Sequence, residues 1–336
     1  MTRKHLMTSL SRLRSKLFGV IALMALVPLS AHAGTWQYGV HSTPHGTRAY
    51  QLWVPTGYTA GSPIPLVVSL HPCGLVPSAW AGLTRLNALA DTRKFMVLYP
   101  RQSIAVNPSG CWNWFLSSNQ SRGAGEPGIV KSMVDWIKSQ YSIDNKKVYV
   151  FGLSAGAAMT STMLACYSDV FAAGAIGAGF MYKAATDPIE AAGLPSNGSI
   201  HSPTLRGLHA WQCSGAPTPR RTGVLVFQGS ADTLVGPINS DQIITQFAKT
   251  NDYSDDGSSN NTVRDVATGN GSGSAGGRSF TWRHFQYGGK LLLSYYTIIG
   301  MGHTWSGGDP FYSPGVSTAG PDASAIMWNF FTQHSL

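Results

Sequence analysis

Charged residues are scarce in this sequence. They account for 12% of its 336 residues, against 43% for hydrophobic residues. Disordered chains combine low hydrophobicity with high net charge, so this composition excludes that class of protein. A chain of this length can instead bury one large core or two small ones. We find no internal repeat.

Basic residues gather at the N-terminus. Five of the 24 Lys and Arg lie in the first 16 residues, MTRKHLMTSLSRLRSK. The apolar run LFGVIALMALVPL follows, which is short for a membrane span, and Ala31-His32-Ala33 then gives a small-x-small cleavage pattern. We predict a secretory signal peptide over residues 1–33, cut after Ala33; the alternative is a short membrane anchor.

Outside that segment the sequence lacks any Lys- or Arg-rich run. Without residues 1–33 the formal charge falls from +9 to +4, because five cations leave and no acid does. The basic character of the whole chain is therefore no evidence for a nucleic-acid partner. We expect neither nucleic acid nor a stable membrane anchor, and the sequence does not predict an oligomeric state.

Cysteine is also rare, and its spacing argues against a zinc site. Cys73, Cys111, Cys166 and Cys213 form no CxxC pair, so we expect neither a metal nor a cofactor. In an exported protein an even number of cysteines suggests disulfides. Four cysteines allow three pairings, and spacing alone does not choose among them.

Apolar runs of strand length alternate with segments of helical periodicity. The predicted strands cover residues 65–72, 95–100, 146–152, 222–229 and 290–300. The predicted helices cover residues 82–95, 128–141, the alanine-rich run after Ser154, 238–249 and 321–334. This alternation predicts an α/β fold with a mostly parallel central sheet and helices on both faces.

Three segments lack such patterns. Residues 254–261 and 269–277 are polar and rich in Gly, Ser and Asn, and we expect them to form mobile loop between two core strands. Residues 183–222 are rich in Pro and Gly. We expect that segment to be a lid-like insertion over the functional site.

The segment VYVFGLSAGAAM, residues 148–159, changes from strand pattern to helix pattern at Gly-x-Ser-x-Gly. Glycines at 152 and 156 permit a sharp turn that exposes Ser154 at the end of the strand. The helix that follows directs free N–H groups at that position. We therefore predict a nucleophilic serine, although a plain Gly-flanked turn is the alternative.

A serine nucleophile needs a base and a group that orients the base. Asp232 follows one predicted strand and His303 follows the next long one, in the chain order that this fold uses. We predict that His303 takes the proton of Ser154 and that Asp232 orients the imidazole; a loop cap and a loop histidine are the alternatives. Other candidates are placed less well: Asp252, Asp255, Asp256, Asp309, His201 and His209. His71 remains as an alternative base.

His71-Pro72-Cys73 follows the strand at 65–72. In hydrolases of this kind that strand end supplies a backbone N–H for the oxyanion. Pro72 has no N–H, so we assign the two donors to the backbone of Cys73 and Ala155. The alternative is a proline turn with a buried cysteine.

These motifs together resemble the secreted esterases of the poly(3-hydroxybutyrate) depolymerase family, which are related to feruloyl and acetylxylan esterases. The matching segments occur in family order and span residues 50–335: SLHPCG, FMVLYPRQ, CWNWF, GEPGIVKSMVDWI, SIDNKKVYVFGLSAGAAM, DVFAAGAIGAG, FQGSADTLV and GMGHTWSGG. The resemblance implies an α/β-hydrolase fold over residues 34–336 as one catalytic domain. It also implies the triad Ser154, Asp232 and His303.

The resemblance implies further site residues. It places Cys73 at the oxyanion hole and pairs it with Cys111, which leaves Cys166 with Cys213. It further implies that Trp112, Trp114 and Trp305 line an acyl or polymer groove; core packing of the three indoles is the alternative.

Two departures from the family pattern affect what is expected, one of the oxyanion hole and one of the substrate. The family usually has His-Gly-Cys where this chain has His71-Pro72-Cys73, which puts the backbone of the oxyanion hole in doubt. We also expect no separate polymer-binding domain. The expected function is therefore a secreted esterase, extracellular or periplasmic, acting on poly(3-hydroxybutyrate)-type polyester or its oligomers. Alternatives are a feruloyl or acetylxylan esterase and a non-catalytic binding protein on a hydrolase scaffold.

Overall fold

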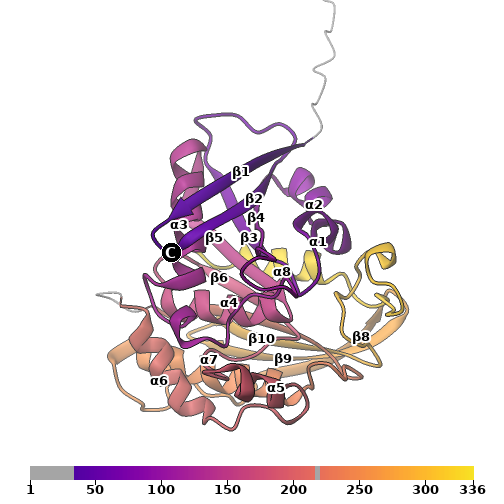
Figure 1. Cartoon of the computed structure of the whole chain (residues 1–336). Helices are drawn as coiled ribbons and strands as arrows, with labels where there is room; N and C mark the ends of the chain where they lie inside the picture. Colours follow the sequence, from indigo (N-terminus) through magenta and orange to yellow (C-terminus); the bar gives the residue numbers. More distant parts are fainter. Residues whose placement is uncertain (1–33, 216–219) are drawn as a thin grey trace, which may run out of the picture. The chain divides into compact units, whose positions relative to one another are not determined.

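A ten-stranded sheet forms the centre of the computed structural model, which describes residues 34–215 and 220–336 (Figure 1). The strand order is β1-β2-β4-β3-β5-β6-β7-β10-β9-β8. The strands are β1 (Thr35–Thr43), β2 (Gly46–Val54), β3 (Ile64–Leu70), β4 (Met96–Pro100), β5 (Ile143–Leu153), β6 (Ala173–Gly177), β7 (Gly223–Gly229), β8 (Gly269–Ala275), β9 (Arg278–Tyr287) and β10 (Lys290–Ile298). The strands from β4 to β10 in this order are parallel, and an antiparallel pair flanks them on each side. The predicted signal peptide lies outside the described residues.

Helices cover both faces of the sheet, as the sequence predicts. Their bounds are α1 (Pro77–Thr84), α2 (Leu86–Arg93), α3 (Gly125–Gln140), α4 (Ala155–Cys166), α5 (Pro188–Asn197), α6 (Pro203–Cys213), α7 (Ile238–Asp256) and α8 (Ala323–Phe331), with short 3₁₀ turns at Ser117–Asn119 and Pro310–Tyr312. On one face α2 contacts both α1 and α8. On the other face α3 contacts α4, α4 contacts α6, and α6 contacts α7. Within the described residues, no helix combines the length and apolar character needed to cross a membrane.

Helix α4 is buried on every side. Each of its residues is buried, and its sequence AGAAMTSTMLAC carries no charge. A helix that is apolar all round belongs in a core. Helix α4 packs on β5 and β6 with one side and on α6 and α3 with others, so the insertion covers it.

Most of the predicted strands and helices are present in the structure: the helices predicted at 128–141, 238–249 and 321–334 correspond to α3, α7 and α8. The five predicted strands correspond to β3, β4, β5, β7 and β10. The predicted helix at 82–95 is two helices, because Arg85 between α1 and α2 has a left-handed backbone with φ 52°. The predicted loop at 269–277 is wrong: β8 occupies most of it and pairs with β9 as a hairpin.

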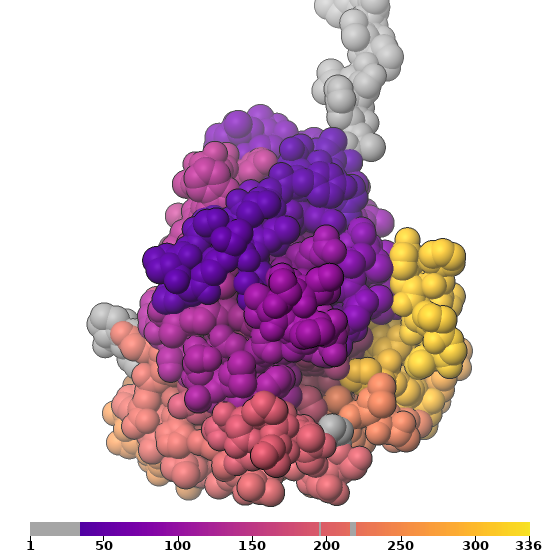
Figure 2. Space-filling model, viewed as in Figure 1, coloured from indigo at the N-terminus to yellow at the C-terminus, as the bar shows by residue number. Residues whose placement is uncertain are grey.

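The insertion at 183–222 is helical in its described part. It contains α5 and α6, and α6 packs on α4 and α7. Tyr182 Oη donates to the carbonyl of Gln120 at 2.6 Å, so the start of the insertion contacts the segment before α3. Figure 2 shows the pink-red residues of the insertion on the lower part of the same face as the purple residues near 110. Its action as a lid stays a prediction.

The strands β3, β5, β7 and β10 end at one edge of the sheet, and α4 begins there at very short distance. A Cβ atom added to Gly156 would lie 2.1 Å from the carbonyl oxygen of Leu70, and one added to Gly152 would lie 2.4 Å from the carbonyl carbon of Gly156. Both neighbours are backbone atoms and have no room to move. The two glycines therefore bring the first turn of α4 against the ends of β3 and β5.

We predict that Gly156→Ala lowers the free energy of unfolding by about 1–3 kcal/mol, because the new methyl group overpacks against backbone. Urea unfolding followed by circular dichroism measures this. Gly193→Ala is the matched control, since a Cβ there meets nothing within 4 Å. The control is expected to be neutral or stabilising by up to about 1 kcal/mol, because alanine favours the helix. Equal stabilities of the two variants would contradict the close-approach interpretation.

Candidate active site

Ser154 occupies a strained turn between β5 and α4. Its backbone has φ 57° and ψ −122°, a conformation that non-glycine residues rarely adopt. The N–H of Ser154 donates to the carbonyl of Gly177 at 2.9 Å, and its own carbonyl accepts from Ala158 at 3.0 Å. The turn is thus tied to β6 on one side and to α4 on the other, which holds the serine at the edge of the sheet.

Asp232 and His303 are in direct contact. The distance from His303 Nδ1 to Asp232 Oδ2 is 2.7 Å, and the Asp232 carboxylate is buried. Asp232 lies in the loop after β7 and His303 in the loop after β10. Because these strands are parallel neighbours, their loops leave the sheet side by side. The structure therefore brings together two of the three residues predicted from the sequence.

The surroundings of Asp232 determine which ring nitrogen of neutral His303 carries the proton. Asp232 Oδ1 accepts two backbone N–H groups, from Leu234 and Val235, both at 2.9 Å. Oδ2 accepts from Gln228 Nε2 at 3.4 Å and faces the imidazole at 2.7 Å. A carboxylate oxygen accepts, so Nδ1 of His303 is the donor. In the neutral ring Nε2 is then the unprotonated nitrogen and can accept a proton.

The two loops are joined to each other by hydrogen bonds from backbone N–H groups. Ala231 N donates to the carbonyl of Met301 at 3.0 Å, and Gly300 N donates to Ser230 Oγ at 2.8 Å. These bonds lie directly beside Asp232 and His303. They hold the carboxylate and the imidazole in register without using either side chain.

Trp305 connects the histidine loop to the serine turn. A Cβ on Gly177, whose carbonyl accepts the N–H of Ser154, would lie 3.0 Å from Trp305 Cζ3. The indole thus packs against the strand end that holds Ser154, two residues from His303. Ser154 follows β5 and His303 follows β10, and these two strands are linked by β6 and β7 in the sheet order β5-β6-β7-β10.

The predicted oxyanion donors lie on two adjoining segments. Ala155 is the first residue of α4, so its N–H has no partner within the helix. Cys73 lies two residues beyond His71, whose carbonyl is 2.6 Å from the Cβ position built on Gly156. The loop after β3 therefore adjoins the first turn of α4, and the roles of the two N–H groups stay predictions.

His71 is buried and both of its ring nitrogens are engaged. Nε2 accepts the N–H of Gln102 at 3.0 Å, and Nδ1 therefore donates to the carbonyl of Pro72 at 2.9 Å. Burial lowers the pKa of His71 to about 4, with a smaller contribution from the Arg101 charge. These contacts do not suit His71 as an alternative base for Ser154; they give it a role in holding its own loop.

The expectation of an aromatic groove is wrong, because all three indoles are buried. Trp112 and Trp305 are 1% exposed and Trp114 is 7% exposed. Trp305 Nε1 donates to Ser324 Oγ at 2.9 Å, and Trp114 stacks on Phe180 with ring centroids 4.7 Å apart. All three are part of the hydrophobic core, which is the alternative that the sequence left open.

The structure contains the two disulfides whose pairing the family resemblance implies. Cys73 is bonded to Cys111, and Cys166 to Cys213. The first joins the loop after β3 to the segment before α3. The second joins the C-terminal ends of α4 and α6, which fastens the insertion to the core.

The acids and histidines that the sequence analysis set aside contact other partners. Asp252 Oδ2 pairs with Lys249 Nζ at 2.8 Å, and His201 pairs with Glu190 at 3.1 Å. His209 Nδ1 lies 3.1 Å from an Arg206 nitrogen. Among the described contacts, none of these three groups faces Asp232 or His303.

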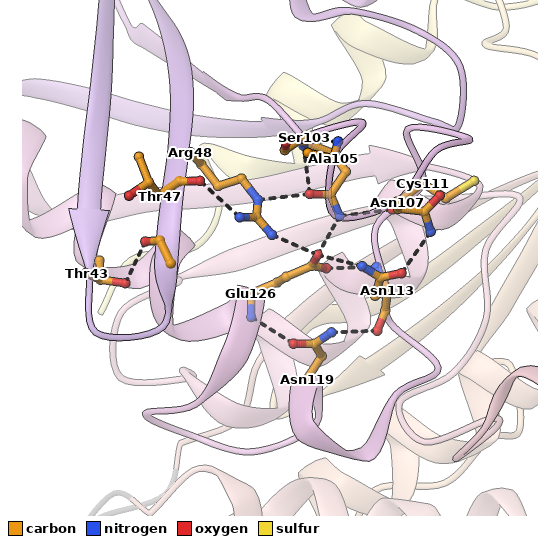
Figure 3. A network of polar contacts seen from close by, with 12 residues as sticks. Thr43, Thr47, Arg48, Ser103, Ala105, Asn107, Cys111, Asn113, Asn119 and Glu126 are labelled. Atoms are coloured by element: carbon orange, nitrogen blue, oxygen red, sulfur yellow. Dashed lines mark hydrogen bonds and ion pairs between the residues drawn. The ribbon is translucent and has the colours of Figure 1, made fainter.

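Sequence analysis missed a buried polar network beside the Cys73–Cys111 disulfide (Figure 3). Its centre is Glu126, in the first turn of α3, which is 3% exposed and paired with Arg48 at 3.3 Å. Gln102, two residues after β4, donates to the same carboxylate. The available signal was that Glu126 is one of only 15 acids and lies in GEPGIVKSMVDWI, one of the segments that match the family.

Comparison with known proteins gives consistent results. The family model described as Esterase PHB depolymerase matches residues 48–266. A poly(3-hydroxyalkanoate) depolymerase C of Paucimonas lemoignei is 36% identical over 86% of this chain and 66% of its own length. A feruloyl esterase B of Thermothelomyces thermophilus is 29% identical over 55% of this chain and 64% of its own length. The chain thus spans slightly less than two thirds of these relatives.

A solved acetyl xylan esterase from Aspergillus awamori has the same fold. It superimposes with a TM-score of 0.65 at 23% identity, over 81% of this chain and 94% of that one. The α/β-hydrolase fold predicted from the sequence is confirmed.

We predict that His71 makes folding stability depend on pH. Its folded pKa is about 4 and its usual value is 6.5, so below pH 6.5 the unfolded chain binds a proton that the folded chain does not. Stability is therefore lost as the pH falls from 6.5 towards 4. The loss attributable to this one residue is roughly 2–3 kcal/mol between pH 7 and pH 4.5.

Urea unfolding of the natural chain and of His71→Gln at both pH values measures the effect. The variant lacks the titrating ring, so its stability should fall less over this interval. Equal losses for the two proteins would contradict the assignment.

Proposed function

Because the chain belongs to the esterase PHB depolymerase family, we propose that it is a serine esterase acting on poly(3-hydroxybutyrate)-type polyester or its oligomers. The observation that carries this proposal is the 2.7 Å contact between His303 and the buried Asp232, on the sheet edge where the strained turn presents Ser154. A serine, a histidine and an acid in this chain order support acyl transfer.

In the proposed reaction Ser154 Oγ attacks the ester carbonyl while Nε2 of His303 accepts its proton. Collapse of the tetrahedral intermediate releases the alcohol end of the polyester, which takes that proton from His303. Water, deprotonated by the same nitrogen, then attacks the acyl-enzyme and releases the hydroxy acid. Asp232 stabilises the imidazolium and keeps the ring oriented throughout.

The negative oxygen of each intermediate would lie between the backbone N–H groups of Ala155 and Cys73. Helix α4 adds the positive end of its dipole at the same point. Fixed backbone donors stabilise charge that develops only during the reaction, so they lower the barrier without tightening substrate binding.

Exposed apolar side chains other than tryptophan would meet the apolar substrate. Loops at this edge expose Val76 after β3, Ile104 after β4, Leu234 after β7 and Phe311 after β10. Leu234 is two residues from Asp232. An uncharged aliphatic polyester suits such surroundings.

The second candidate substrate is a plant cell-wall ester, feruloyl or acetyl. The relative from Thermothelomyces thermophilus supports it, although that similarity covers less of this chain than the depolymerase does. We place the polyester first for that reason.

We also propose that the protein acts outside the cytoplasm, in the periplasm or the medium. Two disulfides among its four cysteines suit an oxidising compartment. The N-terminal sequence has the pattern of a secretory signal, as described above.

We predict that Ser154→Ala lowers hydrolysis of p-nitrophenyl butyrate by roughly 10⁴-fold or more, because the nucleophile is lost. Circular dichroism checks that the variant folds. Ser139→Ala, on the exposed side of α3, should keep full activity. Full activity in Ser154→Ala would refute the mechanism, whereas an inactive natural chain would favour a binding protein.

The substrate prediction is tested by two release assays on the purified chain. We expect 3-hydroxybutyrate or its oligomers from amorphous polyester, and much slower release of ferulate or acetate from xylan. The inactive Ser154→Ala variant serves as the blank for both assays. Release from xylan alone would overturn the order of the two candidates.

A further inference from the structure

We propose that Glu126 is a positioning residue for the oxyanion hole. Its carboxylate holds Gln102, and Gln102 in turn holds His71 and Cys111, the two groups that fix the backbone at Cys73. This inference rests on the proposed esterase function, and it adds a residue about 50 positions from Cys73 in sequence to the determinants of catalysis.

The groups around Glu126 require a carboxylate. Oε1 accepts from Arg48 Nη2 at 3.3 Å, from Asn113 Nδ2 at 3.0 Å and from Gln102 Nε2, and Oε2 accepts from Asn113 N at 2.8 Å. Every one of these partners is a donor. An amide at this position would set its own NH₂ group against a donor and leave the buried guanidinium of Arg48 without a counter-charge.

Gln102 is the junction between Glu126 and the rest of the network (Figure 3). Its Oε1 accepts from Arg48 Nε and from Ser103 N, both at 2.9 Å. Its Nε2 donates to Glu126 and to the carbonyl of Cys111, the latter at 3.0 Å. Gln102 is 2% exposed, and only one orientation of its amide satisfies both ends.

One path from Gln102 reaches the oxyanion loop through His71. The backbone N–H of Gln102 donates to His71 Nε2 at 3.0 Å, and His71 Nδ1 donates to the carbonyl of Pro72 at 2.9 Å. That carbonyl belongs to the same peptide unit as the N–H of Cys73. The imidazole of His71 therefore sets the orientation of the Cys73 N–H, the proposed donor. Gln102 in turn fixes the position of that imidazole.

A second path reaches the same loop through the disulfide. Cys111, whose carbonyl is held by Gln102, is bonded to Cys73, and Gly74 N donates to the carbonyl of Ser109 at 3.1 Å. The loop is thus tied on both sides of the Cys73 peptide. Pro72 replaces the usual glycine here, and these ties give the loop a defined orientation despite that change.

The test is Glu126→Gln, assayed with p-nitrophenyl butyrate at a temperature where the variant is folded. We expect kcat to fall by roughly 10- to 100-fold with KM nearly unchanged, because a misplaced donor weakens only transition-state binding. The affinity for an alkyl trifluoromethyl ketone should fall by a similar factor. Its adduct with Ser154 places an oxyanion in the hole.

Asp252→Asn is the matched control. Asp252 is also a buried carboxylate, paired with Lys249 and accepting backbone N–H groups from Asn261 and Val263, but it lies in α7. Its change to an amide should lower stability and leave kcat and inhibitor affinity unaltered. A folded Glu126→Gln with the natural kcat and inhibitor affinity would overturn the proposal.

A pair of variants at His71 tests the path independently, including the case in which Glu126→Gln does not fold. His71→Gln keeps an acceptor for the N–H of Gln102, whereas His71→Leu keeps none. We expect the Gln variant to retain a kcat at least several-fold above that of the Leu variant. Equal values would overturn the path through His71.

These results are distinguishable from failure of the proposed function. If the natural chain hydrolyses no ester, or if Ser154→Ala remains active, the esterase mechanism fails. If the natural chain is active and depends on Ser154, only the comparison of Glu126→Gln with Asp252→Asn decides the role of Glu126.

Discussion

The close approach of α4 to the ends of β3 and β5 is the constraint on which the rest of the site depends. Gly156 lies so near the carbonyl of Leu70 that no side chain fits between them. This contact forces the chain through the left-handed conformation at Ser154 and brings the free N–H groups of α4 beside the loop after β3. The contact between Gly156 and Leu70 thus has two consequences. It places a serine at the point of strain, and it brings the start of α4 beside the loop after β3.

Parallel pairing brings together the two proposed partners of that serine. Strands β7 and β10 are neighbours that run in the same direction, so their following loops leave the sheet at one edge. The loops then bond to each other through backbone atoms, and the carboxylate of Asp232 is oriented by the N–H groups of Leu234 and Val235. The contact with His303 is therefore built on rigid scaffold, as precise catalytic geometry requires.

Although charged residues are few, some of them are buried in the interior of the protein. Glu126 and Arg48 are buried together, and the donors around Glu126 leave no position for an amide. Such a buried pair costs desolvation free energy, and it adds little to stability compared with an apolar pair. What it provides here is orientation: one arrangement of Gln102, and through it one arrangement of the loop that contains Cys73.

The sequence by itself determined the buried strands of the α/β fold, because strands covered on both faces are continuous apolar runs such as VLVF in β7. It also determined that Ser154, Asp232 and His303 follow strand ends. Only the tertiary structure decided that β8 is a strand, since its Gly and Ser residues gain their conformation from pairing with β9. It likewise decided that the three tryptophans are core and that Glu126 reaches Gln102. Burial and hydrogen bonding between distant segments depend on packing, which no local pattern encodes.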